Sequence, residues 1–140
     1  MASKELLDKL NEAIANEVLV SVQYMWHHVT VRGINAESVG GVFKDISITE
    51  MKHAEAIAER LDYLGGVPTT MPLKKAVCIG GNIKEKLEVD KRAEEEAIEL
   101  YREIIRMAEK EGDFTTKRLF EEILSQEEDH HNTFSTLLEQ

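Results

Sequence analysis

Apolar side chains recur every three or four residues in four long segments, which is the spacing of one face of an α-helix. Short breaks at Gly33 to Asn35, and again at Gly112 and Asp113, separate the members of each pair of segments. Helices joined by so few residues must lie side by side and run antiparallel. The pattern therefore predicts two helical hairpins, with helices over about residues 4–32, 36–64, 83–111 and 114–139.

The longest interruption, about residues 65–82, contains both prolines of the chain, Pro68 and Pro72. A connection of this length can stretch on the order of 60 Å at about 3.3 Å per residue. A helix of about 28 residues spans only roughly 42 Å, so the connection can run the length of a bundle and leave the second and third helices parallel. We expect an all-α fold, a four-helix bundle with one long crossover that forms a single domain over residues 1–140.

Charge and composition exclude several classes of protein. Seventeen Lys and Arg against 27 Asp and Glu give a formal net charge of −10, which disfavours nucleic acids and anionic membranes and favours cations. No uncharged apolar run approaches the roughly 20 residues of a membrane span, and Ser3, Lys4 and Glu5 stand where a secretory signal would be apolar. We therefore expect a cytoplasmic protein. Its single cysteine, Cys78, can form neither an internal disulfide nor a four-thiolate metal site.

The second half of the chain repeats the first at an offset of 77 residues. Eight of the nine identities fall on one stripe per helix, and only Lys9 with Lys86 lies elsewhere. The resemblance is thus confined to positions that would face a common interior, which indicates two halves related by a pseudo-twofold axis. The eight pairs are Leu10 and Leu87, Glu17 and Glu94, Tyr24 and Tyr101, Phe43 and Phe120, Ile46 and Ile123, Glu50 and Glu127, His53 and His130, and Leu61 and Leu138.

Six ionisable residues on these stripes lie where a helical bundle ordinarily has apolar side chains. Glu17, for example, is in register with Leu10 and Tyr24. Four carboxylates buried together without compensation would cost many kcal/mol or become protonated. A positive charge is therefore expected among the six, which are Glu17, Glu50, His53, Glu94, Glu127 and His130.

The spacing of these residues favours a pair of metal ions as that charge, although a metal-free polar network is the alternative. All four glutamates lie within roughly one helical turn of the same height in the bundle. A Glu from each of two helices and Glu-x-x-His from each of the other two is the ligand set of di-iron and di-manganese bundles, and its O and N donors suit Fe or Mn. We expect Glu50 and Glu127 to bridge the two ions, Glu17 and His53 to complete one set, and Glu94 and His130 to complete the other.

Over nearly its whole length the sequence resembles the bacterioferritin branch of the ferritin-like family. The stretches that carry this resemblance are NEVL at residues 16–19 with Gln23 and Tyr24, EMKHA at 50–54, RLDYLGGVP at 60–68, EIL at 122–124 and EEDH at 127–130. The resemblance implies a ferroxidase in which two Fe(II) ions bind, O₂ or H₂O₂ oxidises them, and ferric mineral collects inside a hollow homo-oligomer. Tyr24 and Tyr101 would then hydrogen-bond near the ions or donate an electron, or simply pack with satisfied hydroxyls.

The resemblance also implies a haem ligand. Met51 follows one of the bridging-type glutamates, and in the resembled family a methionine at that position binds haem across a twofold dimer interface. Val18, Val22, Met25 and Ile48 would form an apolar stripe beside it, as expected of a dimer face with or without haem. The sequence ends close after the fourth helix, so the short fifth helix of typical bacterioferritin cages is not expected, and a 24-subunit shell is not expected either.

Two other functions remain open at this point. A rubrerythrin-like peroxidase uses a similar metal pair, but its usual companion is a domain with four cysteines, and this chain would have to take electrons from another protein. A haem-bridged electron-transfer dimer with a vestigial metal site is the third possibility.

Overall fold

The computed structural model describes residues 2–71 and 75–139, and four α-helices form a single bundle over these residues. Each helix begins at the expected residue and ends one or two residues earlier than expected, and Pro72 lies outside the described residues. The all-α fold with a long connection between its second and third helices is therefore confirmed. The helices are α1 (Lys4–Thr30), α2 (Ala36–Tyr63), α3 (Ile83–Lys110) and α4 (Phe114–Leu138).

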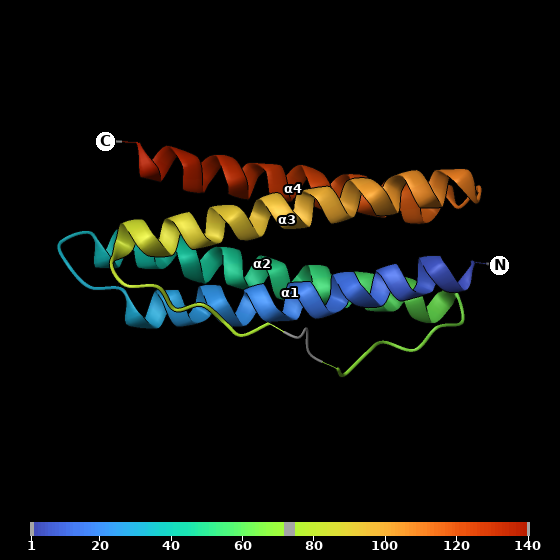
Figure 1. Ribbon diagram of the computed structural model, residues 1–140, viewed down its shortest axis with the longest axis horizontal. Helices are drawn as coiled ribbons and strands as arrows, with labels where there is room; N and C mark the ends of the chain where they lie inside the picture. The colour runs from blue at the N-terminus through green and yellow to red at the C-terminus, as the bar shows by residue number, and fades with distance from the viewer. Residues whose placement is uncertain (1, 72–74, 140) are drawn as a thin grey trace.

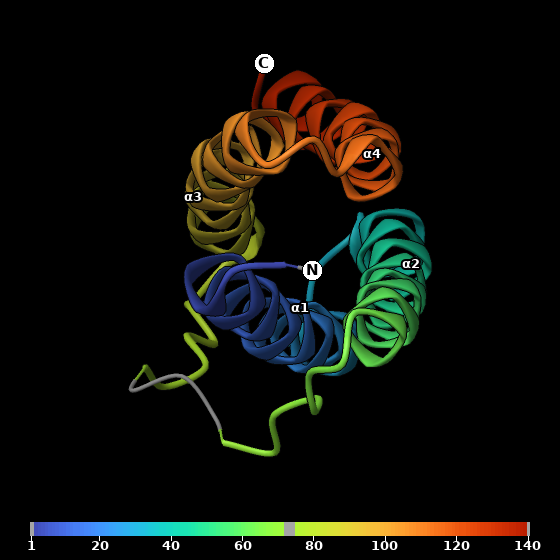
Figure 2. The same cartoon turned by 90° about the vertical axis from the view of Figure 1, so that its right-hand side faces the viewer.

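The helices form two antiparallel hairpins, α1 with α2 and α3 with α4, that pack against each other (Figure 1). Viewed from the end, α1, α2, α4 and α3 follow one another around the bundle, so each helix has two neighbours (Figure 2). Helices α2 and α3 run in the same direction, as the length of the crossover predicts. Among neighbouring helices, α2 and α4 make the fewest contacts.

The helix starts are fixed by side chains that accept hydrogen bonds from otherwise unpaired backbone N–H groups. The hydroxyl of Ser3 accepts from the amide of Leu6 at 3.1 Å. Asn82 forms a capping box with Glu85 at the start of α3. At the end of α2, Gly65 adopts a φ of +90°, which glycine tolerates and which stops the helix.

The crossover is fastened to α1 at two places. Near its start, the side chain of Asn11 donates to the carbonyl of Val67 and accepts from the amide of Thr69, at 3.0 and 2.7 Å. Near its end, the amide of Cys78 donates to the side chain of Gln23 at 3.0 Å. The described parts of the crossover, residues 65–71 and 75–82, therefore lie along the outer side of α1 (Figure 1).

The bundle core consists of two apolar clusters with a polar layer between them. One cluster lies around Leu10, Leu61 and Phe120, and the other lies around Val20 and Phe134. Over the part of the chain that the structure describes, no helix is both long and apolar enough to cross a membrane.

Candidate metal centre

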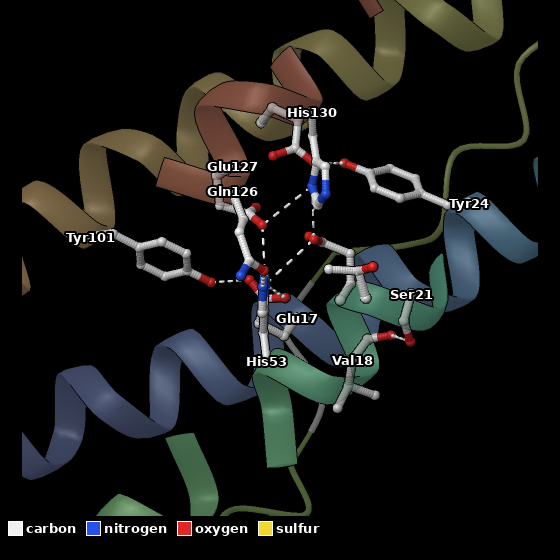
Figure 3. Close-up of polar contacts among 12 residues, drawn as sticks. Glu17, Val18, Ser21, Tyr24, His53, Tyr101, Gln126, Glu127 and His130 are labelled. Carbon is white, nitrogen blue, oxygen red and sulfur yellow. Dashed lines mark hydrogen bonds and ion pairs between the residues drawn. The ribbon is translucent and has the colours of Figure 1, made fainter. Parts of the chain in front are cut away.

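The polar layer contains all six ionisable residues that the internal repeat selects. Helix α1 supplies one glutamate, α3 supplies another, and α2 and α4 each supply a Glu-x-x-His pair (Figure 3). All four glutamates are fully buried. His53 is also buried, and His130 keeps 12% of its side chain exposed. The structure therefore brings together Glu17, Glu50, His53, Glu94, Glu127 and His130, as expected.

The six residues form two overlapping groups of four that share a pair of glutamates. In each group the candidate ligand atoms lie within 4.8 Å of one another. Glu50 and Glu127 belong to both groups, which is the arrangement expected of bridging carboxylates. The first group adds Glu17 and His53, and the second adds Glu94 and His130.

Each histidine points its Nδ1 atom at three carboxylates. His53 Nδ1 lies 3.1 Å from Glu127 Oε1, 3.4 Å from Glu17 Oε2 and 3.5 Å from Glu50 Oε1. His130 Nδ1 lies 3.1 Å from Glu50 Oε1, 3.4 Å from Glu127 Oε1 and 3.7 Å from Glu94 Oε1. The imidazole rings are stacked with their centroids 6.3 Å apart. Each half of the centre thus directs one imidazole nitrogen and three carboxylates toward its own metal position.

The polar atoms of this centre lack the partners that buried polar atoms ordinarily have. Among the described residues, ten buried side-chain N and O atoms have no hydrogen-bond partner, and eight of them belong to these six residues. They include both histidine Nδ1 atoms and both oxygens of each shared glutamate. Two divalent cations would satisfy these atoms, and four carboxylates would balance their charge of +4. The residues present therefore fit a dinuclear metal site.

Without metal, burial and mutual repulsion raise the pKa values of three of the four carboxylates. Burial is the main cause that raises the pKa of Glu17, to about 7, and the charge of Glu127 adds to it. Burial also raises the pKa values of Glu50 and Glu94 well above the usual range. Burial alone would lower the pKa of His53, but the carboxylates of Glu127 and Glu17 outweigh it and raise that pKa to about 10. Burial and the neighbouring carboxylates therefore favour the protonated forms of Glu17, Glu50 and Glu94.

Two buried tyrosines support the centre in a crossed arrangement. The hydroxyl of Tyr24 on α1 donates to Glu94 Oε1 on α3 at 2.8 Å, and the hydroxyl of Tyr101 on α3 donates to Glu17 on α1 (Figure 3). Each tyrosine therefore orients a carboxylate of the opposite hairpin. The satisfied hydroxyls agree with both expectations for these residues, packing and hydrogen bonding beside the site; an electron-donor role stays a prediction.

Comparisons with known proteins agree with this geometry. A family profile described as a ferritin-like domain matches residues 7–140. The chain belongs to the ferritin-like family. A bacterioferritin from Desulfovibrio desulfuricans is 36% identical over 126 residues, which cover 90% of this chain and 70% of that protein. A bacterioferritin from Brucella melitensis is 32% identical over 138 residues, which cover 96% of this chain and 83% of that protein.

A solved structure gives the same result. The crystal structure of a ferritin-like, diiron-carboxylate protein from Bacillus anthracis str. Ames superimposes with a TM-score of 0.92 at 30% sequence identity, and the match covers 99% of each chain. The resemblance to ferritin-like proteins with bacterioferritin relatives is thus confirmed. This chain is a ferritin-like protein with a buried Glu and His site of the di-metal carboxylate kind.

The apolar stripe beside Met51 lies on the outside of the ferritin-like bundle, as expected. Met51 is 47% exposed and contributes to a groove of about 710 Å³ between α1 and α2. Val22, Met25 and Ile48 line the same groove, together with Trp26. The groove is mainly apolar, and the role of Met51 as a haem ligand stays a prediction.

Two sets of polar contacts around the centre were not predicted from the sequence. Gln126 hydrogen-bonds to the outer nitrogen of His53 at 2.5 Å. A second buried polar cluster joins His27 Nδ1 to Asp90 Oδ2 at 2.6 Å, with Gln23 donating to the other oxygen of Asp90 at 3.0 Å. His27 Nε2 also bonds to the carbonyl of Cys78 at 2.7 Å, so this cluster holds the end of the crossover on α1 and α3.

Proposed function

We propose that this protein is a ferroxidase that binds two Fe(II) ions at the centre and oxidises them for iron storage or detoxification. The observation that carries the proposal is the set of eight unpartnered buried atoms, held by four helices around two overlapping positions. Manganese has the same ligand preferences and is the alternative native metal. The similarity to bacterioferritins supports iron.

The donor set suits this reaction because its charge favours the oxidised ion. Four carboxylates neutralise two Fe(II) ions and attract two Fe(III) ions more strongly. Each Fe(II) gives up one electron, and the pair of electrons reduces O₂ with two protons to H₂O₂, or H₂O₂ with two protons to two water molecules. Tyr24 and Tyr101 hold the terminal carboxylates of Glu94 and Glu17 in place during the change in metal charge.

Replacement of a shared glutamate tests this assignment. Glu127→Ala removes a carboxylate that belongs to both groups, so rapid Fe(II) oxidation should be abolished, while helix content measured by circular dichroism stays nearly unchanged. Glu128→Ala is the matched control, because Glu128 is the next residue on α4 and is exposed. Stopped-flow absorbance of the ferric product measures both variants. Unchanged oxidation in Glu127→Ala would contradict the site.

Retention of iron separates storage from peroxide reduction. A storage protein should keep ferric mineral well beyond two iron ions per subunit, whereas a rubrerythrin-like peroxidase should saturate at the dinuclear centre. Size-exclusion chromatography of the iron-loaded protein, with iron analysis of the eluted peak, measures this ratio. A stoichiometry that stops at two would favour the peroxidase.

We also propose that the groove beside Met51 takes a haem between two copies of the chain. The supporting observation is that Met51, a half-exposed methionine, lines an apolar groove outside the bundle core. Met51 of each of two copies would hold the haem iron. A bound haem adds a redox-active group outside the dinuclear centre, as a haem-bridged dimer would use for electron transfer.

A further inference from the structure

The two halves of the centre differ at the outer nitrogen of each histidine. His53 Nε2 lies 2.5 Å from the side-chain oxygen of Gln126. The offset of 77 residues pairs Gln126 with Thr49, and the hydroxyl of Thr49 instead donates to the carbonyl of Asp45 in its own helix, at 3.2 Å. Over residues 2–71 and 75–139, no protein group hydrogen-bonds to His130 Nε2. The pseudo-twofold symmetry is therefore broken immediately outside the candidate ligands.

The bond from Gln126 determines how His53 faces the centre. An amide oxygen only accepts hydrogen bonds, so Nε2 carries a proton and the lone pair of the neutral ring is on Nδ1. That Nδ1 atom is buried, unpartnered and aimed at Glu17, Glu50 and Glu127. Such outer partners fix the tautomer and the orientation of a metal-binding imidazole.

The bond also connects two helices that otherwise pack little against each other. His53 is on α2 and Gln126 is on α4, and these are the neighbouring helices with the fewest contacts. Figure 3 shows the side chain of Gln126 extending toward the ring of His53. The side chain of His53 is 6% exposed, whereas that of His130 is 12% exposed. His53 is thus held from both sides, and His130 is held only from within the centre.

We propose that Gln126 is a positioning residue that makes the two metal positions unequal. The position formed by Glu17 and His53 with the shared glutamates binds its metal first and more tightly. The position formed by Glu94 and His130 binds second, more weakly, and exchanges its metal more readily. This inference rests on the proposed function, because it requires that the centre binds two metal ions.

Titration of the metal-free protein with Co(II) tests the inference without any measurement of activity. Visible absorbance of the bound Co(II), together with calorimetry, should resolve two binding steps of unequal affinity. Gln126→Leu should weaken the first step about 10- to 100-fold, the usual effect of removing an outer partner of a ligand, and leave the second step unchanged. Gln126→Glu restores a hydrogen-bond acceptor and should keep the first step tight. Gln126 is exposed, so these variants should fold.

Three further variants assign the steps. His53→Ala should remove the tighter step, and His130→Ala should remove the weaker one. Thr49→Val is the symmetry-matched control and should change neither. Two identical steps in the unmodified protein, or an unchanged first step in Gln126→Leu, would overturn the inference and leave the ferroxidase proposal standing. Failure of the unmodified protein to bind Co(II) would instead overturn the dinuclear site itself.

Discussion

Glu127 ionises differently from the other three glutamates of the centre, although all four are buried. Burial raises its pKa, but the imidazoles of His130 and His53 outweigh burial, and the pKa falls well below its usual range. The pKa values of Glu17, Glu50 and Glu94 are raised. The same contacts raise the pKa of His53 to about 10 and that of His130 to about 9, because both imidazoles face the Glu127 carboxylate.

The metal-free protein should lose stability as the pH rises from about 5 to 10. Glu17 has an unfolded pKa near 4.5 and a folded pKa of about 7, and His53 has values near 6.5 and about 10. Throughout both ranges the folded state binds more protons than the unfolded state, so raising the pH favours unfolding. Melting temperatures in the presence of a chelator measure this dependence.

Glu17→Gln is the control for this dependence. It is isosteric and does not titrate, so it should flatten the part of the curve between about pH 4.5 and 7. A metal ion that binds only the folded state should raise the melting temperature at neutral pH, because it displaces the protons and satisfies the same atoms. If the melting temperature of the metal-free protein increased with pH over this range, the pKa values of these groups would not be raised by burial in the folded state.

The residues that could be predicted from the sequence are repeated in both halves of the chain, and those that could not be predicted are not. The six candidate ligands were predictable because both halves of the chain carry the same side chain at matching positions. Gln126 pairs with Thr49, Asp90 with Ala13, and His27 with Ile104, so the internal repeat gives no signal for any of them. Their roles depend on which helix lies opposite, and this is known only from the three-dimensional arrangement.

Asp113 fixes the start of α4 and joins it to α2. Its carboxylate accepts from the amide of Thr116 at 3.0 Å and from Arg60 on α2 at 2.8 Å. Burial raises the pKa of Asp113, but the hydrogen bonds from Thr116 and Arg60 outweigh it, and the pKa falls below its usual value. The sequence places a break between the helices at Asp113, but it does not predict the contact with Arg60, which lies 53 residues away.

Asp113→Ala should lower the free energy of unfolding by about 1–2 kcal/mol, because α4 loses its cap and Arg60 loses its partner. Asp113→Asn keeps an acceptor for the cap and should cost less. Urea denaturation of the metal-free variants measures both changes. If Asp113→Ala and the unmodified protein had the same free energy of unfolding, the cap at Thr116 and the contact with Arg60 would not stabilise the protein.

The path of the crossover could be predicted only in part. Its length shows that it can span the bundle, but its position on α1 depends on Asn11, Gln23 and His27. These polar residues belong to α1, and the spacing of apolar side chains in that helix predicts only which face points into the bundle. Side-chain contacts to the backbone of an irregular segment have no period, so no sequence pattern indicates them.

In the whole molecule, the groove beside Met51 and the metal centre are separate sites. We therefore expect haem binding and Fe(II) oxidation to be lost independently of each other. Met51→Leu keeps the apolar surface but removes the thioether, so haem binding should be lost while the rate of Fe(II) oxidation and the native mass stay unchanged. Haem absorbance after reconstitution, native mass and oxidation rate measure the three properties. Loss of oxidation in this variant would link the groove to the metal centre, which the assignment to separate sites does not allow.

Each candidate metal position takes three residues from one hairpin and a single glutamate from the other, Glu127 for the first and Glu50 for the second. One hairpin alone therefore cannot complete either position, whereas two copies related by a twofold axis complete both. Both positions therefore depend on the packing of the two hairpins against each other.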